Sequence, residues 1–208
     1  MNASLIEKEF PKIRKLKDGT EIKIRLMDRN DRDRILEFFK NIPEEEKIYL
    51  RENVSDPKEI ENYWIRRIED KYSITLLAFL MNEMVGEATL HQDMAGWSSH
   101  VGHIRINVAK KFQSRGIATI LADEIYNIAT KVGLEKVCAE IIREQEKALK
   151  IFKHLGFKEE AILKDHVKDL KGQKHDLILL SNNPSELLDE IKHHIKFMDM
   201  GLPSGVSD

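Results

Sequence analysis

A strand, a short loop with a glycine and a long helix follow one another directly in the middle of the chain. HVGHIRINV (100–108) alternates apolar and polar residues, which is typical of a strand with one buried face. From 117 to 132 the apolar residues recur at helical spacing, and Gly133 follows as a C-terminal stop signal. Another apolar strand is expected at 134–142. A strand, a helix and a second strand in this order predict a helical crossover between strands of one sheet.

The remaining segments extend this sheet and cover it. Apolar or alternating runs predict further strands, and amphipathic runs predict helices. The strands are expected at 21–26, 73–80, 84–92, 157–170 and 174–181, the last two as a hairpin, and the helices at 31–42, 43–52, 56–70 and 146–155. This order predicts an α/β (α+β layered) fold with a mixed, largely antiparallel central sheet and helices on both faces.

We expect the chain to have three parts. Residues 1–20 are an N-terminal extension, 21–181 form the folded domain, and 182–208 are a C-terminal helix and tail. The predicted helix at 185–200 carries an apolar stripe, so it must pack on the domain or on a second subunit. A monomer and a homodimer therefore both remain open.

Composition excludes several classes of function. The chain has 208 residues and a net charge of −2, which argues against a general binder of nucleic acid or of membrane surfaces. The single cysteine, Cys138, rules out an internal disulfide and a CxxC metal site, and we expect no metal. The longest apolar run, 74–81, is too short to span a bilayer, and the first residues lack the apolar core of a signal peptide. We expect a cytoplasmic protein.

The loop QSRGIAT (113–119) has the form of an anion site. The first N–H groups of a helix have no partners within the helix and lie at the positive end of its dipole. A glycine such as Gly116 lets a phosphate approach the backbone without a Cβ in the way. Lys110, Lys111 and Arg115 add positive charge. From these residues alone, a loop that only turns a strand into a helix is an equal alternative.

Two motifs in this region resemble a known family. VAKKFQSRGIA (108–118) resembles the pyrophosphate-binding motif of the GNAT acetyltransferase superfamily, Q/R-x-x-G-x-G/A after a strand. QEKALKIFKHLGF (145–157) resembles the later motif of the superfamily, commonly N-x-x-A-x-x-L-Y-x-K-x-G-F. In this chain Gln145, Phe152 and His154 replace the usual Asn, Tyr and Lys. The resemblance runs from about residue 21 to 181, which makes that part the expected acetyltransferase domain.

The resemblance implies that acetyl-CoA is the acyl donor and that a primary amine is the acceptor. The pyrophosphate would bind the backbone N–H groups of the loop, and the pantetheine would lie like an extra strand beside the end of 100–108. The residues expected to bind the donor are Ile106, Asn107, Val108, Gln113, Ser114, Arg115, Gly116, Ile117, Ala118, Thr119, Gln145 and Phe152.

A general base is expected where two neighbouring strands carry polar residues in alternation. Glu87, Thr89 and His91 alternate with apolar residues on one strand, and His103, Arg105 and Asn107 do so on the next. If the strands pair, the two sets share one face. Glu87, His91 and His103 would then cluster beside the thioester end of the donor. The alternative is that this face is simply solvated.

A finer resemblance concerns the acceptor. LKDGTEIKIRLMDRNDRDRILEFF (16–39) and EEEKIYLRE (44–52) resemble the opening of Pat-type protein lysine acetyltransferases of bacteria and archaea. GEATLH (86–91) resembles the segment of those proteins that carries a catalytic glutamate and a nearby histidine, here Glu87 and His91. The resemblance implies a protein lysine as acceptor. The alternatives are a small amine, a peptide N-terminus, or an acyl-CoA sensor that acts through a partner without catalysis.

Overall fold

The computed structural model describes residues 6–50, 54, 56, 58–62, 67, 70–93, 96–169 and 171–184. The predicted helix at 185–200 and part of the predicted helix at 56–70 lie outside these residues, and the expected division into three parts remains a prediction. No helix among the described residues combines the length and the apolar character that crossing a bilayer requires.

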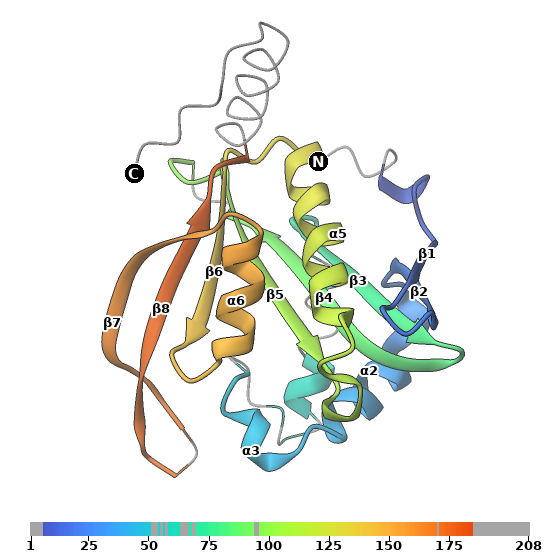
Figure 1. The fold of residues 1–208 in the computed structure, drawn as a ribbon, viewed down its shortest axis with the longest axis horizontal. Helices are drawn as coiled ribbons and strands as arrows, with labels where there is room; N and C mark the ends of the chain where they lie inside the picture. Colours follow the sequence, from blue (N-terminus) through green and yellow to red (C-terminus); the bar gives the residue numbers. More distant parts are fainter. Residues whose placement is uncertain are drawn as a thin grey trace, which may run out of the picture.

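An eight-stranded sheet forms the centre of the molecule (Figure 1). Its strands run in the order β1-β2-β3-β4-β5-β6-β8-β7. β5 and β6 are parallel, and all the other neighbours are antiparallel. The strands are β1 (Lys12–Lys15), β2 (Glu21–Leu26), β3 (Ser73–Leu80), β4 (Glu83–Gln92), β5 (Val101–Val108), β6 (Lys136–Ile142), β7 (Lys158–Lys168) and β8 (Lys174–Asn182). The predicted fold class, a mixed and largely antiparallel sheet, is confirmed.

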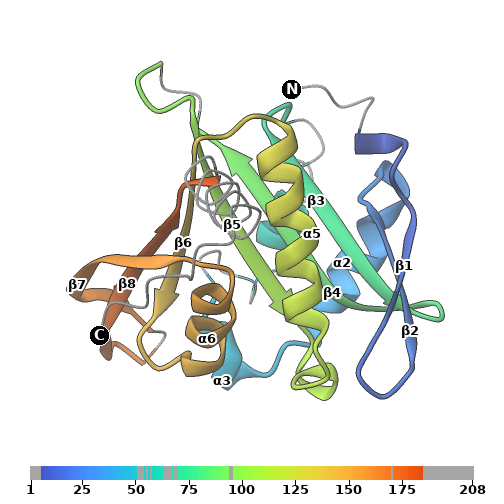
Figure 2. The ribbon, with the colours of Figure 1, turned by 45° about the horizontal axis from the view of Figure 1, so that its top comes forward.

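Helices cover both faces of this sheet (Figures 1 and 2). The alternation of β3 shows how one strand serves two layers, since successive side chains of a strand point to opposite faces. Leu76 and Ala78 belong to the core cluster under α5, whereas Leu77 belongs to the cluster under α2. The helices are α2 (Arg32–Lys40), α3 (Glu44–Lys47), α5 (Ile117–Lys131) and α6 (Glu146–His154), with 3-10 turns η1 (Arg29–Asp31) and η2 (Lys110–Phe112).

The first strand, β1, was not expected from the sequence. It lies in the segment 1–20, where KIRK shows no apolar alternation. It pairs with β2, and its cationic side chains also bind Glu124 on α5, whose buried carboxylate needs cationic partners. Lys12 Nζ lies 2.7 Å from Glu124 Oε2, and Arg14 Nε lies 2.6 Å from Glu124 Oε1. The sheet therefore gains an edge strand whose Lys12 and Arg14 side chains bind Glu124 on α5.

The parallel pair β5–β6 ends early. Register pairs join Val101–His103 to Lys136–Cys138, and no β5–β6 pair beyond them occurs in these fully described strands. β5 continues to pair with β4 as far as Val108, and β6 continues to pair with β8 as far as Ile142. Each strand keeps its outer neighbour, so the two diverge and leave a gap between their inner edges, which Figure 2 shows beside α6.

Candidate active site

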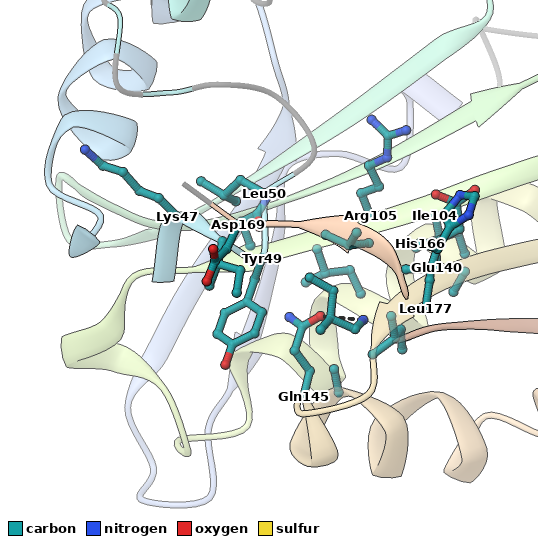
Figure 3. Close-up of a pocket in the computed structure, with 18 of the residues that line it drawn as sticks. Lys47, Tyr49, Leu50, Ile104, Arg105, Glu140, Gln145, His166, Asp169 and Leu177 are labelled. Atoms are coloured by element: carbon teal, nitrogen blue, oxygen red, sulfur yellow. Dashed lines mark hydrogen bonds between the residues drawn. The ribbon is translucent and has the colours of Figure 1, made fainter. Parts of the chain in front are cut away.

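A cavity of about 490 Å³ lies in the gap between β5 and β6. Its walls come from both strands, from α6 and the residue before it, from the segment that follows α3, and from the end of β7 (Figure 3). Four of the residues expected to bind the donor line it: Ile106, Asn107, Gln145 and Phe152. The β5 and β6 residues in its walls are Ile104 to Asn107 and Ala139 to Ile142.

The gap suits a chain of amides. In an antiparallel pair only alternate backbone groups of a strand bond to its partner, and the others point to the opposite side. For β5 after His103, that opposite side faces the gap. Backbone polar groups away from water require partners. An extended amide-bearing arm such as pantetheine fits this edge because it can supply them.

The loop before α5 has the geometry of an anion site. Gly116 is the N-cap of α5 and has φ +92°, in the left-handed region that favours glycine. A Cβ built there would meet no atom within 4 Å, so the space in front of the loop is open. The first hydrogen bond of the helix runs from Ile120 N to Gly116 O at 3.1 Å. The N–H groups of Ile117, Ala118 and Thr119 precede it and are available to a pyrophosphate.

Acidic side chains already bind the cations of this region. Arg115 Nη2 lies 2.8 Å from Asp18 Oδ2, and hydrogen bonds from Thr20 and Arg115 hold the pKa of Asp18 well below its usual value. Lys110 binds Glu45 at 2.7 Å, and Lys111 pairs with Glu83. The loop's attraction for an anion therefore depends more on its backbone N–H groups than the sequence alone suggested.

A lysine from α6 joins the loop, and sequence reasoning missed it. Lys147 Nζ donates to Ser114 Oγ at 2.9 Å. Ser114 itself has φ +63°, so the backbone is left-handed on both sides of Arg115. Lys147 is the third residue of the later family motif, but nothing in its spacing indicates that α6 packs beside the loop. It is a candidate to bind a phosphate of the donor.

The two polar sets of β4 and β5 share one face of the sheet. Glu87 lies opposite Asn107, Thr89 opposite Arg105, and His91 opposite His103. Residues four apart on one strand are separated by about 13 Å. Glu87 is therefore at one end of this row and the two histidines are at the other. The expected cluster of three is in fact two separate sites.

Glu87 is buried with its carboxylate in a hydrogen-bond network. Only 2% of the residue is exposed. Asn107 Nδ2 donates to Glu87 Oε1 at 2.8 Å, and Thr89 Oγ1 donates to Glu87 Oε2 at 3.0 Å. Thr89 Oγ1 in turn lies 2.9 Å from Thr75 Oγ1 on the neighbouring strand β3. Glu87 is not part of the cavity wall, but Asn107 is, and it connects the carboxylate to the cavity.

His91 and His103 lie away from the cavity wall. His91 Nδ1 lies 2.8 Å from Ser73 Oγ and 3.2 Å from Asp70 Oδ2. Burial raises the pKa of Asp70, but hydrogen bonds from Ser73 and the Tyr72 N–H outweigh it, so the pKa is lowered and Asp70 stays ionised. Burial lowers the pKa of His103, so its imidazole is neutral at pH 7.

Phe152 lines the cavity but has no hydroxyl to protonate a leaving thiolate. It is buried and packs edge-on against Phe157, with ring centroids 5.0 Å apart. Among the described residues that line the cavity, Tyr49, in the segment after α3, is the one with a hydroxyl group, and it is 39% exposed. Figure 3 shows Tyr49 and Gln145 among the side chains around the cavity. Sequence reasoning did not single out Tyr49, because its approach to the cavity depends on how α3 packs.

Gln145 connects the cavity to the start of α6. Its Oε1 accepts the Ile142 N–H at 3.1 Å, and its own N–H donates to Ile142 O at 2.8 Å. This double contact fixes the corner between β6 and α6. The amide nitrogen of the side chain is the group with which Gln145 can bind a ligand in the cavity.

The described residues contain no group of three or more His, Cys, Asp or Glu side chains close enough together to hold a metal ion.

Comparison with known proteins supports this architecture. A family model described as an acetyltransferase (GNAT) domain matches residues 24–179. A GNAT-family acetyltransferase from Streptococcus pneumoniae is similar in structure, with a TM-score of 0.68 and 19% identity, over 78% of this chain and 99% of that one. The GNAT domain of S. lividans PAT has a TM-score of 0.68 and 20% identity, over 83% and 96%.

A spermidine N-acetyltransferase chimera from Vibrio cholerae and hSSAT has a TM-score of 0.67 and 20% identity, over 80% of this chain and 98% of that one. At these identities the three structures show a shared fold. The family match covers most of the chain, including the loop and the diverging strands. The chain belongs to the GNAT acetyltransferase family and is an acetyl-CoA-dependent N-acetyltransferase.

Proposed function

We propose that the enzyme transfers an acetyl group from acetyl-CoA to the side-chain amine of a protein lysine, by direct attack assisted by Glu87. The observation that carries the mechanism is the 2.8 Å bond between Glu87 and Asn107. It connects a buried carboxylate to a side chain in the cavity wall. A single sheet face thus supplies both a base and a route to it.

The donor supplies an activated acetyl group when it is bound in the gap. Its amides suit the inner edge of β5, and its pyrophosphate suits the N–H groups of Ile117, Ala118 and Thr119. Lys147 and Ser114 suit its phosphates. Backbone N–H groups near the end of β5 would donate to the thioester carbonyl oxygen, where negative charge develops in the transition state. The residues around the cavity therefore fit acetyl-CoA.

Glu87 would act as general base through a water molecule. A lysine amine has a pKa of about 10.4, so holding it neutral at pH 7 costs on the order of 4–5 kcal/mol. A positioned base recovers part of this cost. The carboxylate is separated from the cavity by Asn107, so a water beside Asn107 would carry the proton. We expect direct attack, with no acetylated cysteine, because the chain's one cysteine, Cys138, is not among the described residues that line the cavity, and burial raises the pKa of its thiol.

The proposed acceptor rests on sequence resemblance and on a structural neighbour. The segments 16–39, 44–52 and 86–91 resemble Pat-type enzymes, and the GNAT domain of S. lividans PAT shares the fold. A small polyamine is the second candidate. The cavity wall includes the carboxylates of Glu140 and Asp169, and a spermidine acetyltransferase is among the similar structures.

Gly116→Val should weaken acetyl-CoA binding by roughly tenfold or more, equivalent to about 1.4 kcal/mol. The new side chain would occupy the open space that the pyrophosphate requires. Gly133→Val is the matched control, because Gly133 ends the same helix with φ +81° and an equally open Cβ position. Both variants should lose similar stability, but calorimetric titration should find weakened binding only in Gly116→Val. Unchanged affinity in a folded Gly116→Val protein would refute the site.

Glu87→Gln should lower kcat by roughly 100-fold or more at pH 7, as expected when a general base is lost. Acetyl-CoA affinity should stay near that of the wild type. The loss should shrink as the pH approaches the pKa of the amine, because the amine is then already neutral. His91→Gln and His103→Gln are the comparisons, measured over the same pH range. If Glu87→Gln keeps full activity and His103→Gln loses it, the base is His103.

Mass spectrometry of cell lysate treated with the enzyme and acetyl-CoA tests the acceptor. We expect new acetyl groups on lysine side chains of proteins. A parallel reaction with Glu87→Gln identifies the sites that acetyl-CoA modifies without catalysis, and these sites are subtracted from the result. Acetylation found only on added spermidine, or only on protein N-termini, would contradict a lysine acceptor while leaving the acetyltransferase activity intact.

A further inference from the structure

The short helix α3 has few means of holding its position. It is one turn long, Glu44–Lys47, and none of its side chains is buried. Its last residue, Lys47, and the segment that follows it, Ile48, Tyr49 and Leu50, nevertheless form part of the cavity wall. The N–H groups of Tyr49 and Leu50 donate to the carbonyls of Glu46 and Lys47, both at 3.0 Å. The position of α3 therefore determines where this wall lies.

Two carboxylates of α3 bind the region that leads to the pyrophosphate loop. Glu45 Oε1 lies 2.7 Å from Lys110 Nζ, and Glu46 Oε1 lies 3.6 Å from the same atom. Gln113 Nε2 donates to Glu46 Oε2 at 3.1 Å. Glu46 is the more enclosed of the two, with 19% of its side chain exposed against 67% for Glu45.

The side-chain amide of Gln113 connects the loop before α5 to α3 and to the end of β5. An amide nitrogen carries two hydrogens. One faces Glu46, and the other faces the carbonyl of Val108 at 3.2 Å, at the end of β5. With both directions used, this side chain has no further hydrogen to give a phosphate while these bonds hold. The side chain thus connects parts of the protein to one another, and the expected contact of Gln113 with the donor remains a prediction.

We propose that Glu46 is a positioning residue that acts through Gln113, holding the cavity wall formed by Lys47 to Leu50 against the loop that binds the donor. This inference rests on the proposed binding of the donor at that loop. When the loop binds an anion, Gln113 becomes fixed, and Glu46 transmits the change to α3 and the residues after it. Donor binding thereby orders this wall of the cavity.

Hydrogen exchange of the full chain, with and without coenzyme A, tests this coupling at the amides of Lys47, Tyr49 and Leu50. In the wild type, coenzyme A should slow their exchange. Glu46→Ala should speed it by roughly two- to tenfold, the range for losing one hydrogen bond of typical strength. The slowing by coenzyme A should also disappear, although calorimetry should still find coenzyme A bound.

Three variants separate positioning from a general loss of structure. Glu46→Gln keeps an oxygen that accepts from Gln113 and should behave like the wild type. Glu46→Ala combined with Gln113→Ala should be no worse than either change alone. Glu83→Ala removes a carboxylate that binds the adjacent Lys111 but does not belong to α3, so it should leave these amides unchanged.

The outcomes distinguish the two proposals. Failure of the wild type to bind coenzyme A would refute the donor site itself. Binding of coenzyme A with the same exchange response in wild type and Glu46→Ala would overturn the role of Glu46 and leave the donor site standing.

Discussion

The hydrogen bonds between β5 and β6 extend only from Val101 to His103 on β5. Each strand then follows its outer neighbour, and a cavity of about 490 Å³ opens between them. Two consequences follow from this early end. The inner edge of β5 can bond to an extended ligand in place of a strand, and Asn107 becomes part of the cavity wall. The proposed donor site and the proposed proton route therefore depend on the same divergence.

The second constraint is the order of elements at the end of β5. The strand leads through η2 into a loop whose Gly116 is left-handed, and α5 begins directly after it. An extended ligand along β5 thus meets helix N–H groups at its far end. Because Asp18, Glu45 and Glu83 bind the loop's cations, we expect these N–H groups and Lys147 to carry much of the proposed recognition of phosphate.

Local patterns predicted the strands and the long helix closely. An apolar run predicted a buried strand at 73–80, where β3 lies, and helical spacing predicted 117–132, where α5 covers Ile117–Lys131. The apolar residues of these segments themselves indicate the element that they form. β1 was missed because its sequence shows no apolar pattern, and its contacts are pairing with β2 and ion pairs with Glu124, which is more than a hundred residues away in the chain.

The site was predicted in part for the same reason. The two-residue period of a strand places Glu87 and His91 on one face of the sheet, but it does not say which of them lies near the cavity. That depends on where β5 and β6 part, which no local pattern encodes. Lys147, Tyr49 and the contact between Glu46 and Gln113 likewise arise from packing between segments distant in sequence.

Backbone NMR of the protein with and without acetyl-CoA tests the central claim most directly. The account predicts that saturating acetyl-CoA slows amide exchange and shifts resonances at two places together. These are the alternate amides of Ile104 to Val108 that face the gap, and the amides of Ile117, Ala118 and Thr119. Strand β1, on the far edge of the sheet, should stay unchanged. Binding of acetyl-CoA that leaves both regions unaffected would contradict the account.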